Sequence, residues 1–444
     1  MRRWISGHRS LDRLILGLAW PNIISNLSVP LLGLVDLTMM GHLNSPVYIG
    51  AVALGSVIFS FIYSGLAFLR MGTTGMTAIR FGAGDKQGII SVLRTSIITA
   101  LMLGFLLVVF RTLISGIGFG LLGGSEEVKN YARSYFDIRI FAAPAVLLQY
   151  VLQGWFIGLQ DSRSPMYVVI TENVLNILFN IFFVWFLNMR SDGIALGTVI
   201  ARYAGLGLSL YFLKTKYPEY FFTLFMKFSG QQKISIKKFL GINLNLFIRT
   251  ILLISVLSAF TSWSAKQGDE ILASNSLLLQ FFYLFSYITD GFAFAAESLS
   301  GRFNGGKQII RLRVVVKRIF IFGFFLALFF SVFYFVSGKI IISLLTSQET
   351  VRMISYMYLP YIWIIPLASF AAFLWDGIYI GSTATRALRN VMIVSSIVFF
   401  ILPIIMKPSN HVLWIAFVLF LLARGLGLWM ASPKAIFYTI DKKP

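Results

Sequence analysis

Long apolar stretches follow one another along almost the whole chain of 444 residues, and no other feature constrains the fold as strongly. About 20 apolar residues are enough for a helix to cross the hydrocarbon core of a bilayer. Backbone groups find no other partners in hydrocarbon, and the stretches lack the alternation of barrel strands, so helices are required. Twelve stretches are present: 14–40, 48–79, 88–116, 133–159, 166–187, 193–213, 238–263, 271–300, 314–337, 352–378, 388–407 and 411–432. We therefore predict an all-α integral membrane protein with twelve transmembrane helices.

The composition excludes several other classes of protein. Hydrophobic residues make up 57% of the chain and charged residues 12%, which is more apolar surface than a soluble fold can bury. A net charge of +21 suggests nucleic acid binding in a soluble protein, but here the basic residues lie in clusters between apolar stretches. The sequence has no cysteine, no histidine cluster, no Walker A loop and no visible nucleophile–base pair. We expect neither enzyme activity nor a cofactor nor a nucleic acid partner.

The distribution of lysine and arginine predicts the orientation of the helices. Most of the 38 basic residues lie in connections that face one side, above all between 214 and 238 and between 302 and 318. By the positive-inside rule this side is the cytoplasm. We expect a multi-pass protein of the cell (inner) membrane with both termini in the cytoplasm. The basic start of the chain is interpreted as part of a retained first helix, because the stretch that follows is too long and too polar for a cleaved signal.

An internal duplication divides the chain into two halves of six helices. One long polar connection, the cytoplasmic linker 214–237, separates an N-lobe (1–213) from a C-lobe (238–444). Residues recur at nearly constant offsets: Gly154, Ile157, Gly158 and Arg163 as Gly377, Ile380, Gly381 and Arg386 at 223, and Phe61, Gly84, Lys86 and Gln87 as Phe282, Gly305, Lys307 and Gln308 at 221. An even number of helices keeps both halves in the same orientation. We therefore predict two lobes related by a pseudo-two-fold axis along the membrane normal, with a cavity between them.

Asp36 lies near the outer end of the first apolar stretch, in a long segment without lysine or arginine. An ionisable residue within a membrane span is costly, so by default it marks a proton site or a transport pathway. Met39 and Met40 follow it and place it inside the span. Burial in an apolar lobe favours its neutral form, so protons that arrive from outside would neutralise it. The alternative is a carboxylate at the membrane interface without any role.

Two polar residues on other helices reach the same depth as Asp36. At 1.5 Å per residue, Asp36 lies about 6 Å below the outer end of its helix, Asn180 about 10 Å and Thr198 about 8 Å. Polar side chains at one depth on three helices can share hydrogen bonds or a cation. The alternative is ordinary bonding between helices, worth about 0.6 kcal/mol per contact.

Glu172 shares a helical face with Asn176 and Asn180 but lies about 12 Å deeper than Asn180. Two interpretations are open: an inner stop for protons, or a structural ion pair with Arg202 on the next helix. On the second apolar stretch, Arg70 has no partner that the sequence identifies.

The C-lobe has intramembrane charges of its own. Arg249 and Asp290 lie at similar depth on consecutive helices, so they are expected to form a structural pair, or else to serve as a second relay or a contact for a cationic substrate. Glu297, further along the helix of Asp290, and Asp376 are candidates for the same relay or substrate contact. Asp376, near the cytoplasmic end of its helix, is expected to hold Arg386.

Six stretches, taken in their order along the chain, carry a resemblance to a known family. They are WPNIISNLSVPLLGLVDLTMMGHL at 20–43, AFLRMGTTGMTA at 67–78, GWFIGLQDSRSP at 154–165, GIALGTVIARY at 193–203, DGFAFAAESLSG at 290–301 and WDGIYIGSTATRALRN at 375–390. They resemble the multidrug and toxic compound extrusion (MATE) transporters, and within them the DinF-like branch, over essentially the whole chain. The resemblance implies two six-helix lobes in a V around a central cavity, and a cation-driven antiporter that exports amphipathic, often cationic compounds.

The resemblance also implies a cation-coupling site in the N-lobe. The family has an aspartate on helix 1, an asparagine and an aspartate four residues apart on helix 5, and a threonine on helix 6, which correspond here to Asp36, Asn176, Asn180 and Thr198. The family proline at which helix 1 bends corresponds to Pro21. Position 180 departs from the family pattern, because asparagine brings no charge and cannot titrate. A sodium site with one carboxylate is weaker, so we predict proton coupling through Asp36, with a weak Na⁺ site at the same residues as the alternative.

The preferred hypothesis is a monomeric secondary antiporter in the lipid bilayer that exchanges small amphipathic organic compounds for protons. The 43 Phe, 18 Tyr and 14 Met include side chains suited to flat organic cations. A sodium-coupled antiporter and a lipid-linked oligosaccharide flippase of the same superfamily are the alternatives. A flippase is expected to have a more cationic cavity, whereas Asp36, Asp290 and Asp376 add negative charge. The duplication disfavours a channel or receptor, because alternating access uses two lobes.

Overall fold

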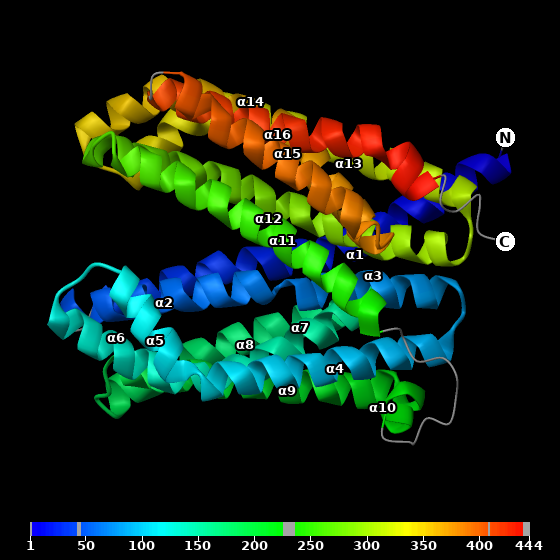
Figure 1. Cartoon of the computed structure of the whole chain (residues 1–444), viewed down its shortest axis with the longest axis horizontal. Helices are drawn as coiled ribbons and strands as arrows, with labels where there is room; N and C mark the ends of the chain where they lie inside the picture. Colours follow the sequence, from blue (N-terminus) through cyan, green and yellow to red (C-terminus); the bar gives the residue numbers. More distant parts are fainter. Residues whose placement is uncertain (1, 42–45, 225–235, 407–408, 438–444) are drawn as a thin grey trace.

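The chain folds into a bundle of helices in two groups (Figure 1). The computed structural model describes residues 2–41, 46–224, 236–406 and 409–437, without the side chains of 2–9, 31–41, 46 and 236. The helices are α1 (Arg2–Gly41), α2 (Pro46–Leu66), α3 (Phe68–Gly82), α4 (Lys86–Val109), α5 (Arg111–Leu121), α6 (Glu126–Arg139), α7 (Ala143–Gly158), α8 (Arg163–Ile181), α9 (Ser191–Lys216), α10 (Pro218–Leu224), α11 (Ile236–Ala265), α12 (Asp269–Gly305), α13 (Ile309–Leu345), α14 (Glu349–Gly381), α15 (Thr385–Ile405) and α16 (Asn410–Ser432). These ranges contain no strand, which confirms the predicted all-α fold.

Eleven segments of the described chain are long and apolar enough to cross a membrane. They correspond to the second to twelfth predicted stretches, and α1 contains the first. Several boundaries differ from the prediction, such as those of α13, which runs from Ile309 to Leu345 instead of 314–337. The third stretch is interrupted at Phe110, between α4 and α5. The fourth begins earlier, at Glu126, because Ser125 caps α6 by accepting a hydrogen bond from the Val128 amide at 3.4 Å.

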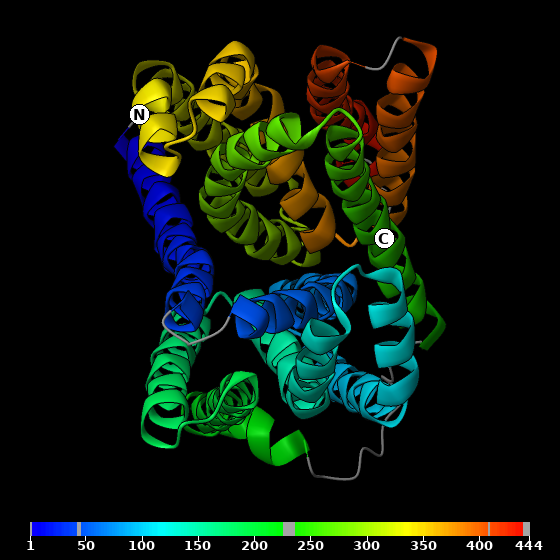
Figure 2. The same ribbon diagram turned by 90° about the vertical axis from the view of Figure 1, so that its left-hand side faces the viewer.

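The long helices run along the longest axis of the molecule, and their connections gather at its two ends (Figure 1). One end holds the start of α1 and the connections α3–α4, α7–α8, α9–α10, α12–α13 and α14–α15. We call it the basic end, because the largest groups of lysine and arginine lie near these connections. Figure 2, which views the molecule from the opposite end, shows α2–α10 and α11–α16 as two groups with α1 between them. Between α2 and α11 lies a groove of 360 Å³ lined by Ser60, Ser64 and Ile254.

Helix α1 belongs to the packing of both lobes. Near the basic end, Ile15, Leu18 and Ile23 are buried in the core cluster that includes residues of α12 and α13. Further along, Ser28 accepts a hydrogen bond from Asn173 of α8 at 3.0 Å. The first half of α1 therefore packs in the C-lobe, and the second half lies beside the N-lobe.

At the basic end the two lobes contact each other through glycines at equivalent positions of the two repeats. A Cβ at Gly82 would overlap the carbonyl oxygen of Arg302, and a Cβ at Gly305 would overlap the carbonyl oxygen of Ile79. The two contacts are equivalent at an offset of 223. The same offset relates Gly154 against Arg70 to Gly377 against Ala293, and Gly158 against Thr74 to Gly381 against Glu297. The register of the second repeated stretch is therefore 223, two residues away from the 221 that the identities indicate.

Candidate functional site

Three of the predicted site residues form a chain of hydrogen bonds between α8 and α9. Asn180 Nδ2 donates to Asn176 Oδ1 at 3.0 Å, and Asn176 Nδ2 donates to the Thr198 hydroxyl at 3.0 Å. That hydroxyl donates in turn to the carbonyl oxygen of Ile194 at 2.9 Å. All three side chains are buried, Asn180 at 0% exposure. A Cβ at Gly197 would overlap Asn180 Oδ1, so this glycine allows α8 and α9 to pack closely at the cluster.

Asp36 lies on α1, but its side chain is outside the part of the chain that the structure describes. The backbone still fixes its level. α1 and α8 run in the same direction (Figure 1), and Asn173 donates to the hydroxyl of Ser28 at 3.0 Å. From this contact Asp36 is about 12 Å further along α1, and Asn180 is about 10 Å further along α8. The helical register therefore brings Asp36 level with Asn180.

Pro21 is buried in α1 near the basic end. Proline has no backbone N–H, so the helical hydrogen-bond ladder has a gap here. Side chains form hydrogen bonds around the gap: Ser25 donates to the Pro21 carbonyl oxygen at 3.0 Å, and Asn22 Nδ2 contacts the carbonyl oxygen of Leu18 at 2.7 Å. Asn22 also donates to the Ser162 hydroxyl at 3.0 Å, which ties this part of α1 to the α7–α8 connection.

Glu172 forms the expected ion pair with Arg202. Arg202 Nη1 lies 2.7 Å from Glu172 Oε1, and Gln149 Nε2 donates to the carbonyl oxygen of Arg202 at 2.8 Å. Glu172 is buried, and both charged residues line a small cavity of 60 Å³. A Cβ at Gly205 would lie 2.6 Å from Gln149 Nε2, so the glycine leaves room for this network. The structure therefore brings the buried Glu172 into an ion pair with the partly exposed Arg202 within the N-lobe.

Asp376 accepts two arginines inside the C-lobe, which corrects two expectations. The predicted Arg249–Asp290 pair is wrong, because Arg249 pairs with Asp376 instead. Asp376 does not hold Arg386. Its second partner is Arg424 on α16, at 2.6 Å and 1% exposure. Arg424 is a site residue that was not predicted, although an arginine within the last apolar stretch signals a functional or paired charge.

Arg70, for which the sequence identifies no partner, has one in the other lobe. Its Nη1 lies 3.3 Å from Glu297 Oε2, and its guanidinium lies 4.1 Å from the centre of the Phe294 ring. Both charged side chains are buried. At the basic end, Arg302 also donates to Gln160 Oε1 at 2.5 Å. Together with the glycine contacts, these interactions hold α3 and the α7–α8 connection against α12.

Asp290 forms no ion pair or hydrogen bond with any residue in the described ranges. It is half-buried, on α12, and Arg70, Arg249 and Asp376 all lie within electrostatic reach of it. One turn away, Asn26 of α1 donates to the carbonyl oxygen of Tyr287 at 3.1 Å. Asp290 is therefore an intramembrane carboxylate near the meeting of α1 and α12, and its negative charge is not engaged by a partner among the described residues.

Comparisons with known proteins bear on this arrangement. The family model described as MatE matches residues 21–182 and 246–406. The chain is 37% identical to DNA damage-inducible protein F of Escherichia coli (strain K12) over 426 residues, which cover 94% of this chain and 91% of the relative.

Solved structures resemble the fold at low sequence identity. A structure of MATE in the bent conformation superimposes with a TM-score of 0.87 at 19% identity, over 97% of this chain and 96% of the other. An outward-facing multidrug resistance MATE family transporter of the MOP superfamily superimposes with a TM-score of 0.84 at 19% identity, over 98% and 97%. The described residues therefore have the fold of these transporters.

Proposed function

The chain belongs to the MatE family and is a multidrug efflux transporter rather than an enzyme, and on this basis we propose that it exports amphipathic organic cations in exchange for protons. Asp36 carries the proton, and the N-lobe cluster of Asn176, Asn180 and Thr198 positions it. The basic end faces the cytoplasm, as the positive-inside rule predicts, and both termini lie on that side. The protein acts as a monomer in the inner membrane.

The hydrogen bonds of the N-lobe cluster favour protons over sodium. The side-chain oxygen of Asn176 accepts from Asn180, and the hydroxyl of Thr198 accepts from Asn176 and donates to a carbonyl oxygen. These oxygens are already engaged with protein donors, whereas a bound cation needs several free oxygen ligands. Asn180 adds no charge. A single carboxylate that takes up a proton is the simplest coupling device that these residues support.

Helix α1 can transmit a change at Asp36 to the contact between the lobes. Its first half packs in the C-lobe core through Ile15 and Leu18, while Asp36 lies level with the N-lobe cluster. Protonation removes the charge of Asp36, and α1 then bends at Pro21, where its hydrogen-bond ladder lacks a bond. Substrate leaves to the outside when this bend lowers its affinity. The gap at Pro21 and the double packing of α1 support this sequence.

Asp290 is proposed as the contact for the positive charge of the substrate. It lies near the meeting of the lobes, and its charge is not engaged by an ion pair among the described residues. Glu297 and Asp376 are less suited, because each is buried against one or two arginines. Tyr287 and Tyr283, on the same helix, offer aromatic surface to a flat cation.

Ion gradients test the coupling ion directly. Proteoliposomes loaded with a fluorescent organic cation are given either an imposed pH gradient or an imposed sodium gradient. We expect the pH gradient alone to drive efflux, and the sodium gradient to leave it at the rate of protein-free vesicles. Efflux driven by sodium would contradict proton coupling. No efflux under either gradient, with the protein folded, would favour the flippase hypothesis.

Replacement of Asp290 tests the substrate contact. Asp290→Asn is expected to raise the KM for a monovalent organic cation by about tenfold or more, since a partly desolvated ion pair is lost, while the maximal rate with a neutral amphipathic substrate stays near wild type. Glu270→Gln, an exposed carboxylate near the start of the same helix, is the matched control. An equal loss for charged and neutral substrates would show that Asp290 supports the fold and not the substrate charge.

A further inference from the structure

The described part of the C-lobe has one more buried arginine than its internal ion pair needs. Arg249 and Arg424 both bind Oδ2 of Asp376, and all three side chains are at most 7% exposed. In the N-lobe the buried Glu172 pairs with Arg202 alone. Two arginines and one aspartate leave the group in the C-lobe with a net charge of +1. A charge within a membrane span is costly, so by default it marks a functional site.

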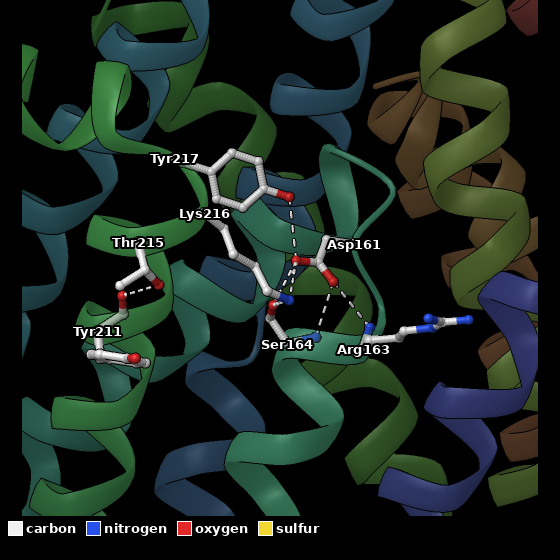
Figure 3. Close-up of polar contacts among 7 residues, drawn as sticks. All are labelled: Asp161, Arg163, Ser164, Tyr211, Thr215, Lys216 and Tyr217. Atoms are coloured by element: carbon white, nitrogen blue, oxygen red, sulfur yellow. Dashed lines mark hydrogen bonds and ion pairs between the residues drawn. The ribbon is translucent and has the colours of Figure 1, made fainter.

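The carboxylate of Asp376 uses only one of its two oxygens. Its Oδ1 atom is buried and accepts no hydrogen bond within the described ranges. Asp161, at the basic end of the N-lobe, uses both oxygens (Figure 3). Its Oδ1 accepts from the Ser164 amide at 3.0 Å, and its Oδ2 accepts from the Ser164 and Tyr217 hydroxyls at 2.5 and 3.2 Å. Since both arginines share one oxygen of Asp376, either of them alone would leave this carboxylate with a partner.

The packing of α12 against α14 places Asp290 beside this group. A Cβ at Gly377 would overlap the carbonyl oxygen of Ala293, and the glycine contact one turn further along both helices gives the same register. In this register Asp290 lies about 3 Å from the level of Asp376 along the helix axes. Among the charged groups around Asp290 in the described ranges, Arg249 acts on it most strongly. The half-buried carboxylate of Asp290 therefore supplies the negative charge that the group lacks.

The internal repeat indicates that the common fold does not need these charges. The contacts described above relate α11, α12 and α14 to α1, α3 and α7 at an offset of 223. At this offset the positions of Arg249, Asp290 and Asp376 are occupied in the N-lobe by uncharged residues, namely Asn26, Ala67 and Gln153. Charges present in only one of two lobes with the same helix packing indicate a role other than packing.

We propose that Arg249 limits the affinity of Asp290 for a cationic substrate, an inference that rests on the proposed role of Asp290 as the contact for the substrate charge. The positive charge of Arg249 attracts the Asp290 carboxylate and repels a cation that approaches it. The substrate therefore binds weakly enough to be released. This repulsion is larger for a dication than for a monocation, so Arg249 also makes the site selective for monovalent organic cations.

Equilibrium binding to the purified full chain in detergent tests the role of Arg249. The probes are tetraphenylphosphonium, the dication p-xylylenebis(triphenylphosphonium) and the neutral triphenylphosphine oxide. We expect Arg249→Gln to bind the monocation about tenfold more tightly than the wild type, and the dication more tightly by a larger factor, up to about 100-fold. The affinity for the neutral compound should not change. Arg249→Lys keeps the charge and should keep all three affinities.

Arg311→Gln, which removes an exposed arginine at the basic end of the C-lobe, is the control and should bind all three probes like the wild type. Thermal unfolding of the same samples checks the fold. Arg249→Gln is expected to unfold near the wild-type temperature, because Asp376 keeps Arg424 at 2.6 Å. If it does not fold, Arg424→Gln removes a charge of the same group. This variant should also tighten cation binding, by a smaller factor, because Arg424 acts more weakly on Asp290.

The outcomes separate this inference from the proposed function. Unchanged cation affinity in Arg249→Gln, together with weaker cation binding by Asp290→Asn, would overturn the role of Arg249 and leave the substrate contact in place. Equal tightening for the charged and the neutral probe would overturn it too, because Arg249 would then shape the site without acting through its charge. Cation binding that does not respond to Asp290→Asn would instead overturn the substrate contact itself.

Discussion

Asp36→Asn is expected to reduce proton-driven efflux of an organic cation to the rate of protein-free vesicles. The substitution keeps the size and polarity of the side chain but removes its ability to exchange a proton, so the coupled cycle has no step that the pH gradient can drive. The measurement is efflux from proteoliposomes with an imposed pH gradient, together with the affinity of the purified variant for the same cation. Binding should persist, because the proposed contact for the substrate charge is Asp290 in the other lobe.

Asn180→Asp is the complementary change at the same level of the N-lobe. It restores a second carboxylate beside Asn176 and Thr198, at a fully buried position. Full proton-driven efflux by Asp36→Asn would contradict the proposed mechanism. An unchanged pH dependence of efflux in this variant would contradict it as well. Rescue of Asp36→Asn by Asn180→Asp would show instead that the proton site can be moved between the two helices.

Asp376→Asn is expected to destabilise the protein by about 3–5 kcal/mol, as measured by thermal unfolding in detergent. The Asp376 carboxylate is the counter-ion of both Arg249 and Arg424, and all three side chains are buried. Without it two guanidinium groups stay in an apolar environment with only partial compensation, such as the Phe420 ring 5.4 Å from Arg424. The loss should appear as a lower unfolding temperature before any change in substrate preference.

Glu349→Gln provides the matched control for this experiment. Its carboxylate pairs with Arg352 at 3.0 Å, but it is 71% exposed, and exposed ion pairs contribute about 0–1 kcal/mol. An unfolding temperature of Asp376→Asn as high as that of Glu349→Gln would mean that water or another group neutralises the arginines in the C-lobe.

Apolar length and helical depth predict much of this molecule. The eleven spans found in the described residues follow stretches that hydropathy identifies, because backbone satisfaction in lipid leaves only helices. The contacts among Asn176, Asn180 and Thr198 also follow from depth, since consecutive helices in a short hairpin are neighbours. The pair Glu172–Arg202 is local for the same reason.

Contacts between helices that are distant in sequence could not be predicted in this way. Counting residues along a helix gives the depth of a residue along the membrane normal but not the direction in which its side chain points. Arg70 therefore had no identifiable partner, although Glu297 lies opposite it in the other lobe. Depth predicts Asp290, on the adjacent helix, as the partner of Arg249. The packing of α14 instead brings Asp376 to Arg249, and α16 brings Arg424 to the same carboxylate. The offset predicted for the second repeated stretch differs by two residues from the one that the glycine contacts give. Identical residues in short motifs indicate one register, whereas the backbone contacts between helices require the other.

The packing of α1 has a consequence for how the protein is made. Residues such as Ile15 and Leu18 leave the ribosome first, but the α12 and α13 residues that bury them are synthesised more than 250 residues later. The leading helix must therefore remain in the bilayer with its core-facing side in lipid until the second half of the chain is inserted. An N-terminal half produced alone lacks this partner surface, so co-expression of two fragments divided in the linker should yield stable material only when both are present.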